Sequence, residues 1–117
     1  MPIQVLNKTR GKVLATHAVE ATGFYERFLG LMGRKELPFG EGLHIVPCNS
    51  IHTFFMRIPI DALFLDASGK VSKAYPALPP WRVTGVYFKV RSVLELPAGT
   101  VAGSGTVEGD ELAFERT

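Results

Sequence analysis

The fold of this chain is organised around residues 48–66, which read CNSIHTFFMRIPIDALFLD. The stretch combines two apolar runs with a dense set of His, Thr, Met, Arg and Asp side chains. Polar groups in a core-like run need hydrogen-bond partners, because burying them without partners is costly. The stretch is therefore either the chemical site of the protein or the internal scaffold of its fold.

The alternation of side chains in residues 50–57 predicts a central β-strand. His52 and Met56 would lie on one face of this strand. Thr53 and Arg57 would lie on the other face, because successive strand residues point in opposite directions. Large apolar groups occur on both faces, which is typical of a strand buried inside a sheet.

Further strands are expected on both sides of this stretch, because short β-prone runs are separated by turn-forming Gly, Pro, Asn and Asp. On the N-terminal side they cover residues 3–6, 13–18 and 43–46. On the C-terminal side they cover residues 62–65, 70–75, 83–90, 92–96 and the tail after a tight turn at 107–112. Turns at 7–11 and 66–69 would make hairpins of two of these pairs.

One helix is expected in the N-terminal half of the chain. Thr22 can cap its first turn. Phe24, Phe28 and Leu31 follow the i, i+4, i+7 spacing of one buried face. Gly33 is a suitable end, since glycine readily adopts the left-handed conformation that closes many helices.

The length and composition describe a single domain that covers residues 1–117. A chain of 117 residues with 46% hydrophobic and 21% charged residues can bury a core without external staples. Many short strands with one helix favour an α+β, β-dominated fold. We expect a small antiparallel-rich sheet, curled into a compact barrel, with one short helix in the N-terminal half.

The sequence carries no feature of a secreted or membrane-spanning protein. Cys48 is the only cysteine, so no intramolecular disulfide can form. Residues 1–12 lack the apolar core of a signal peptide, and no apolar run reaches the roughly 18 residues of a membrane span. A soluble cytoplasmic protein without a membrane partner is therefore expected. The net charge of +2 is too small to indicate a polyanionic partner by itself.

A metal site is the first chemical hypothesis. His44, Cys48 and His52 are spaced by four, which would align them on one face of a helix. Pro47 and the β-branched neighbours favour an extended chain instead, in which four residues span about 13 Å and one ion cannot reach both histidines. The sequence also lacks a glycine-rich phosphate-binding loop. We therefore expect neither a metal nor a cofactor.

Nucleophilic catalysis is the second hypothesis, and it would make the protein a Cys/His-dependent hydrolase or transferase. Cys48 would be the thiolate and His52 its base. Asp61 or Asp66 would orient the imidazole ring. A thiol needs a lowered pKa to attack at neutral pH. The alternative is that Cys48 packs as a small apolar residue, which is the commoner role of a free cysteine.

Recognition of a small molecule or a peptide is the third hypothesis. The polar groups predicted to bind it are His52, Thr53, Arg57, Asp61 and Glu95. The Arg57 guanidinium suits a carboxylate or phosphate group, and His52 can donate or accept a hydrogen bond near neutral pH. The alternative is an internal ion pair of Arg57 with Asp61 or Glu95, which would position strands without binding anything.

Nucleic-acid binding is the fourth hypothesis. Trp81-Arg82 and residues 87–91 interleave aromatic rings with cations, as a surface that stacks single-stranded bases would. The modest net charge weakens this hypothesis, and a solvated strand edge explains the same residues. The favoured interpretation is therefore a small-ligand or peptide binding module, with the Cys/His enzyme and a weak nucleic-acid binder as alternatives.

Five sequence blocks, in this order, resemble a known family. They are Gly30-Leu31-Met32-Gly33-Arg34, Pro47-Cys48 with residues 50–57, Pro59-Ile60-Asp61 with Phe64-Leu65-Asp66, LELPAG at residues 94–99, and Gly109-Asp110 with Leu112. Together they resemble the domain of unknown function family 192, over residues 22–115. The resemblance implies a compact β-rich fold. It implies no particular activity, because that family has no established biochemical function.

Overall fold

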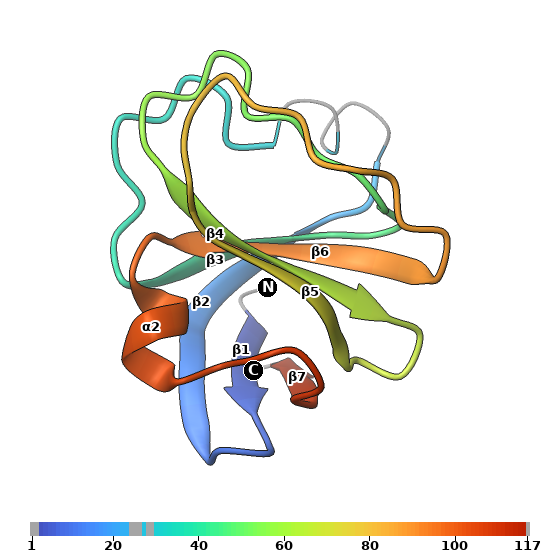
Figure 1. Cartoon of the computed structure of the whole chain (residues 1–117). Helices are drawn as coiled ribbons and strands as arrows, with labels where there is room; N and C mark the ends of the chain where they lie inside the picture. Colours follow the sequence, from blue (N-terminus) through green and yellow to red (C-terminus); the bar gives the residue numbers. More distant parts are fainter. Residues whose placement is uncertain (1–2, 24–26, 28–29, 117) are drawn as a thin grey trace.

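The computed structural model describes residues 3–23, 27 and 30–116. The described chain forms one sheet of seven strands, in the order β5-β4-β6-β3-β2-β1-β7 (Figure 1). The strands are β1 (Ile3–Asn7), β2 (Lys12–Ala21), β3 (Gly40–Ile45), β4 (Ile60–Asp66), β5 (Val71–Leu78), β6 (Val90–Pro97) and β7 (Leu112–Arg116). A short helix, α2 (Thr100–Ser104), follows β6.

The sheet is mixed and curls into a half-barrel (Figure 1). Neighbouring strands are antiparallel except for β2 and β3, which are parallel. Edge strand β5 meets the segment before edge strand β7, where the Val71 N–H donates to the Asp110 carbonyl at 2.8 Å and Lys70 bridges Glu111. The prediction of a curled, β-dominated sheet is confirmed, with a half-barrel in place of the compact barrel.

The turn between β4 and β5 shows why the predicted hairpin forms. Asp66 Oδ1 accepts hydrogen bonds from the N–H groups of Ser68 at 2.9 Å and Lys70 at 3.0 Å. Gly69 closes the turn with a left-handed φ of 85°, which glycine adopts without steric cost. The predicted hairpin of β1 and β2 and the strands expected at β3, β6 and β7 are also confirmed.

The two faces of the sheet pack against different hydrophobic clusters. In β4, Leu63 and Leu65 belong to a cluster that includes residues of β1, β2 and α2. Ala62 and Phe64 point to the opposite face and join a cluster with apolar residues of the long connections between strands. Figure 1 shows these connections mostly at the top of the molecule, and the end of the connection between β2 and β3 runs down toward α2. β4 is therefore buried on both faces.

The central strand predicted over residues 50–57 is wrong. This segment is an irregular loop, and its one ladder contact is an isolated bridge at His52. The Met56 N–H donates to the Thr53 carbonyl at 3.2 Å, and Phe55 has a left-handed φ of 64°. The chain therefore reverses where the alternation requires an extended backbone. The predicted division of the polar groups between two strand faces is wrong for the same reason.

The strand predicted over residues 83–90 is also wrong, except that β6 begins at its last residue. The Thr84 N–H donates to the Ile51 carbonyl at 3.0 Å, and the Tyr87 N–H donates to the Asn49 carbonyl at 3.1 Å. These β-prone residues thus bond to the other long connection and not to the sheet. The two loops satisfy each other's backbone groups.

The helix predicted in the N-terminal half lies mostly outside the described residues, which do not include Phe24 or Phe28. The Arg27 N–H donates to the Gly23 carbonyl at 2.9 Å, and Gly33 lies in a turn. The helix that the structure describes, α2, lies near the C-terminus instead. No helix in the described part of the chain has the length and hydropathy needed to cross a membrane.

Candidate functional site

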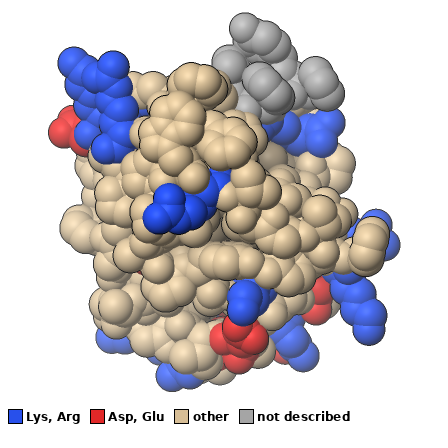
Figure 2. Space-filling model, turned by 45° about the horizontal axis from the view of Figure 1, so that its top comes forward, with Lys and Arg blue, Asp and Glu red and all other residues tan. Residues whose placement is uncertain are grey.

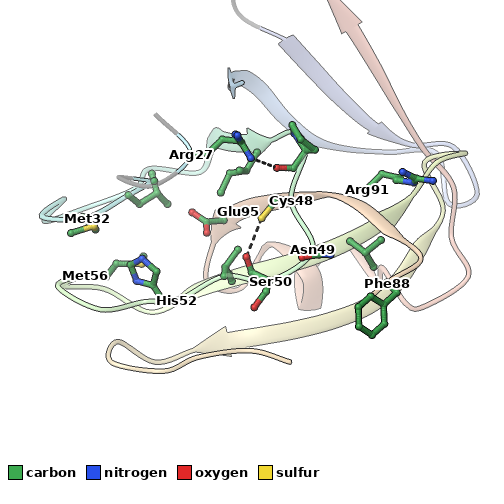
Figure 3. Close-up of a pocket in the computed structure, with 16 residues that line it drawn as sticks. Arg27, Met32, Cys48, Asn49, Ser50, His52, Met56, Phe88, Arg91 and Glu95 are labelled. Carbon is green, nitrogen blue, oxygen red and sulfur yellow. Dashed lines mark hydrogen bonds between the residues drawn. The ribbon is translucent and has the colours of Figure 1, made fainter. Parts of the chain in front are cut away.

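The long connections between strands border a cavity of about 540 Å³ over one face of the sheet (Figure 3). Much of its wall is apolar and includes Leu31, Ile45, Ile51 and Val90. The predicted site residues that line it are Cys48, His52 and Glu95. Apolar walls with a few polar groups are typical of pockets that bind small molecules.

Glu95 reaches this cavity from β6. Leu94 and Leu96 point to the opposite face, because side chains alternate along a strand. Glu95 is 2% exposed, and its Oε1 atom has no hydrogen-bond partner among the described residues. Burial disfavours the charged form of this carboxyl group and raises its pKa to about 8. Glu95 is therefore an uncharged acid at neutral pH.

Gly30 brings the connection between β2 and β3 close to this acid. A Cβ atom at Gly30 would lie 3.8 Å from Glu95 Oε1. Gly30 has a positive φ of 50°, a conformation that L-residues with a side chain rarely adopt. The glycine therefore allows the backbone to approach the carboxyl group without placing a side chain against it.

Cys48 lines the same cavity, and Figure 3 shows its sulfur near the Glu95 carboxyl group in that view. The thiol donates a hydrogen bond to the Ser50 carbonyl at 3.1 Å. Burial raises the pKa of the Cys48 thiol. The backbone of Ser50 opposes this shift by favouring the thiolate, and the Glu95 carboxylate adds to it at the high pH where Glu95 is ionised. A thiol that stays protonated is a poor nucleophile. The arrangement therefore does not activate Cys48 for attack.

His52 adds an imidazole ring to the cavity wall. The Phe54 N–H donates a hydrogen bond to His52 Nδ1 at 3.2 Å. The centroids of the two rings are 5.2 Å apart. The local turn thus orients the half-buried imidazole.

Thr53 was predicted to contact a ligand, but it is fully buried and joins two loops. Its hydroxyl donates to the Pro79 carbonyl at 2.7 Å and accepts from the Arg82 N–H at 2.8 Å. Its backbone N–H donates to the Arg82 carbonyl at 2.8 Å, and its carbonyl accepts from the Trp81 N–H at 2.9 Å. The polar atoms of Thr53 therefore hold the connection after β5 against the connection after β3.

Asp61 lies on the face of the sheet opposite the cavity. Its Oδ1 atom accepts a hydrogen bond from the Ala77 N–H at 2.7 Å. Its Oδ2 atom accepts from the N–H groups of Gly99 at 3.1 Å and Val101 at 2.8 Å. These bonds join β4 to β5 and to the start of α2. Asp61 therefore supports the fold on the face away from the cavity. Asp66, the other predicted orienting carboxylate, accepts hydrogen bonds from Ser68 and Lys70 in the turn between β4 and β5.

Arg57 is exposed and does not line the cavity. Among the described residues, no ion pair joins it to Asp61 or Glu95. The five residues predicted to act together are therefore separated in the fold. His52 and Glu95 line the cavity, Thr53 and Asp61 are bonded within the fold, and Arg57 faces solvent.

His44, the remaining member of the rejected metal set, is also apart from Cys48 and His52. Its ring stacks on Phe114 with centroids 4.2 Å apart, and its Nδ1 atom is 3.6 Å from a Glu20 carboxyl oxygen. Burial lowers the pKa of His44, and Glu20 opposes this shift. Within residues 3–23, 27 and 30–116, no three His, Cys, Asp or Glu residues come together as a possible metal site.

The sequence interpretation missed Arg27 and Met32 as lining residues of the cavity, and it assigned Phe88 and Arg91, which also line it, to a nucleic-acid surface. Arg27 Nη1 donates to the Pro47 carbonyl at 3.0 Å, which ties the connection before β3 to the connection after it. No spacing links these positions in the sequence, because they meet only in the folded chain. The one local signal was an acid between two leucines in a strand, at Glu95.

Comparison with known proteins identifies the family. The family model DUF192, described as Uncharacterized ACR, COG1430, matches residues 5–114. A UPF0127 protein of Thermococcus sibiricus is 34% identical over 116 residues, which cover 95% of this chain and 74% of the relative. The UPF0127 protein PF1050 of Pyrococcus furiosus is 32% identical over 117 residues, which cover 96% of this chain and 98% of the relative.

A solved structure has the same fold. The crystal structure of a protein of unknown function from Novosphingobium aromaticivorans has a TM-score of 0.82 and 24% sequence identity. The match covers 97% of this chain and 84% of that chain. The chain therefore belongs to the DUF192 (UPF0127) family of uncharacterised proteins.

Proposed function

We propose that this domain binds a small organic ligand in the cavity, with Glu95 as the group that recognises it. The observation that carries the proposal is the position of Glu95. Its side chain is 2% exposed and lines a cavity of about 540 Å³. Its Oε1 atom has no hydrogen-bond partner among the described residues. A buried polar atom without a partner destabilises the folded protein. A ligand that supplies the partner removes this cost.

Glu95 and the apolar wall of the cavity favour a ligand with an amine and an apolar body. An ammonium group beside Glu95 stabilises the charged carboxylate, which burial alone disfavours. The apolar body would lie against Leu31, Ile45 and Val90. The cavity volume falls within the range of roughly 300–1,000 Å³ that is common for small-molecule pockets.

Thermal denaturation with matched compounds tests the proposal. Hexylamine and benzylamine should raise the melting temperature at pH 7, whereas hexanol and benzyl alcohol should have a much smaller effect. Hexanoate and benzoate should have a smaller effect than the amines if Glu95 is the recognising group. A larger effect would instead assign recognition to Arg27 and Arg91, which also line the cavity. Melting temperatures that do not distinguish the amines from the alcohols would remove the basis for the proposed recognition.

Calorimetry gives a sharper test, because an amine that ionises Glu95 must release its proton. Titration at pH 7 in phosphate and in Tris, whose ionisation enthalpies differ, should report release of close to one proton per amine bound. The substitution Glu95→Gln keeps the size of the side chain and removes the titrating group, so it should abolish both binding and proton release. The exposed Glu36→Gln variant is the matched control. Equal amine affinity in wild type and Glu95→Gln would refute the role of Glu95.

A further inference from the structure

We propose that the loop end of the molecule, near the cavity opening, is a peripheral binding surface for anionic lipid membranes. The surface, here called the loop face, consists of exposed apolar residues from the connections after β3 and β5. They are Phe54, Phe55, Trp81, Val83, Val86 and Phe88. Phe54 and Phe55 pack against Trp81, and Phe88, just before β6, is 89% exposed. Exposed apolar side chains gathered on one side of a domain are typical of an interaction site.

Two of these aromatic residues have an unfavourable backbone conformation. Phe55 has a φ of 64° and Trp81 has a φ of 63°, both in the left-handed region that residues with a Cβ atom seldom occupy. The two rings pack edge to face with centroids 4.8 Å apart. The fully buried Thr53 joins the two loops through hydrogen bonds to Pro79, Trp81 and Arg82. These contacts fix the two loops in a geometry that leaves the Phe55 and Trp81 rings exposed.

The charge of the loop face matches an anionic partner. Residues 47–60 and 76–92, which include both loops, contain four cationic side chains and no Asp or Glu. The four are Arg57, Arg82, Lys89 and Arg91, and all are exposed. Figure 2, which turns the top of the molecule forward, shows Lys and Arg on this side with no acidic residue at its centre. Basic residues near an apolar surface attract anionic headgroups.

The apolar groups favour a lipid surface over a single-stranded nucleic acid. Val83 and Val86 are more than half exposed, and an aliphatic side chain offers no ring on which a base can stack. Phe54 and Phe55 already pack against Trp81, with centroids 5.9 Å and 4.8 Å away. Tryptophan prefers the headgroup region of a membrane, where its ring is buried and its N–H stays hydrated. Such contact requires no spanning segment.

Trp81 is the only tryptophan, so its fluorescence reports directly on the loop face. Phosphatidylcholine vesicles with about 30% phosphatidylglycerol should shift the Trp81 emission to shorter wavelength. The protein should also sediment together with these vesicles. Vesicles of phosphatidylcholine alone should produce both effects only weakly. Raising NaCl from about 0.05 M to 0.5 M should weaken binding, because salt screens the cationic side chains.

Two exposed phenylalanines provide a matched pair of variants. Phe88→Ser should weaken partitioning into the anionic vesicles by about tenfold, since it removes a ring that the membrane would bury. Phe39→Ser removes a 74% exposed ring that lies near Gly99, next to α2, and should leave partitioning unchanged. Both variants keep Trp81 as reporter and should remain folded, because the side chains are exposed.

Three outcomes would overturn the proposal. The first is wild-type protein that neither sediments with the anionic vesicles nor shows a change in Trp81 emission. The second is equal weakening by Phe88→Ser and Phe39→Ser, which would mean that the loop face is not the contact. The third is a salt-sensitive change with a single-stranded oligonucleotide but none with vesicles, which would assign the loop face to nucleic acid. None of these measurements depends on amine binding at Glu95.

Discussion

Asp61 and Glu95 are both almost fully buried and lie on neighbouring strands, yet their surroundings are opposite. Asp61 pairs in register with Leu96, and Glu95 pairs with Ala62, so the two acids point to opposite faces of the sheet. Asp61 accepts three backbone N–H bonds, whereas Glu95 Oε1 has no partner among the described residues. The buried acid on one face of the sheet therefore has hydrogen-bond donors for both oxygens, whereas Oε1 of the acid on the other face has none among the described residues.

This difference separates a structural group from a candidate functional one. The bonds of Asp61 connect β4 with β5 and with α2, so its burial contributes to the fold. Burial of Glu95 destabilises the folded state whenever the group is charged, because no described donor compensates for the lost water. A leucine or glutamine would avoid this cost. The amine ligand proposed above would supply the partner that Glu95 lacks among the described residues.

The largest effect should come from Asp61→Asn. The amide would direct its own NH₂ group at backbone N–H donors and leave at least one of them buried without an acceptor. We expect a loss of about 3 kcal/mol in the free energy of unfolding, measured by urea denaturation.

Asp66→Asn is the control for this substitution. Asp66 is on the same strand and accepts three hydrogen bonds through Oδ1 alone, at the edge of a solvent-facing turn. An asparagine oxygen can accept the same bonds, so the change should be about 0.5 kcal/mol. Similar losses at the two positions would show that Asp61 has no special structural role.

The next largest effect should be a pH dependence of the free energy of unfolding, which the substitution Glu95→Gln should remove. The folded protein holds the Glu95 proton up to a pKa of about 8, while the ordinary value is 4.5. Between these pH values the folded state binds more protons than the unfolded state, so stability falls as pH rises. From pH 6 to pH 8 this group should remove about 2 kcal/mol from the free energy of unfolding of the wild type.

The unfolding free energies of wild type and Glu95→Gln are measured across this pH range. Their difference isolates the contribution of Glu95, because the two proteins share all other titrating groups. Glu36→Gln, at an exposed position, should keep the wild-type dependence. If the wild type and Glu95→Gln change in parallel over this pH range, Glu95 has an ordinary pKa and the contrast with Asp61 disappears.

The smallest effect should come from Gly30→Ala. The substitution strains a backbone with φ of 50° and places a methyl group 3.8 Å from Glu95 Oε1. We expect a loss of about 1 kcal/mol in unfolding free energy, together with altered amine affinity. Gly33→Ala has a similar strain, with φ of 79°, but no atom within 4 Å of the added methyl group. It should therefore reduce stability alone; an equal change in amine affinity would argue that Gly30 does not adjoin the ligand.

Much of the sheet could be predicted from the sequence, while the loops could not. The hairpins and buried strands depend on local preferences, such as the turn at Asp66 to Gly69, and these were predicted correctly. Residues 50–57 carry an equally regular alternation, but Phe55 is left-handed and Thr53 bonds to the loop after β5. Hydrogen bonds to a distant loop overrode the local preference for a strand.

The sequence by itself determined that Glu95 points away from Leu94 and Leu96, because alternation follows from the geometry of an extended chain. It also determined that Asp61 must find partners if it is buried. Only the tertiary structure decided that Asp61 meets N–H groups 16, 38 and 40 residues away, and that Glu95 meets a cavity covered by distant loops. Side-chain direction is a local property, whereas the groups that a side chain meets depend on how remote segments pack.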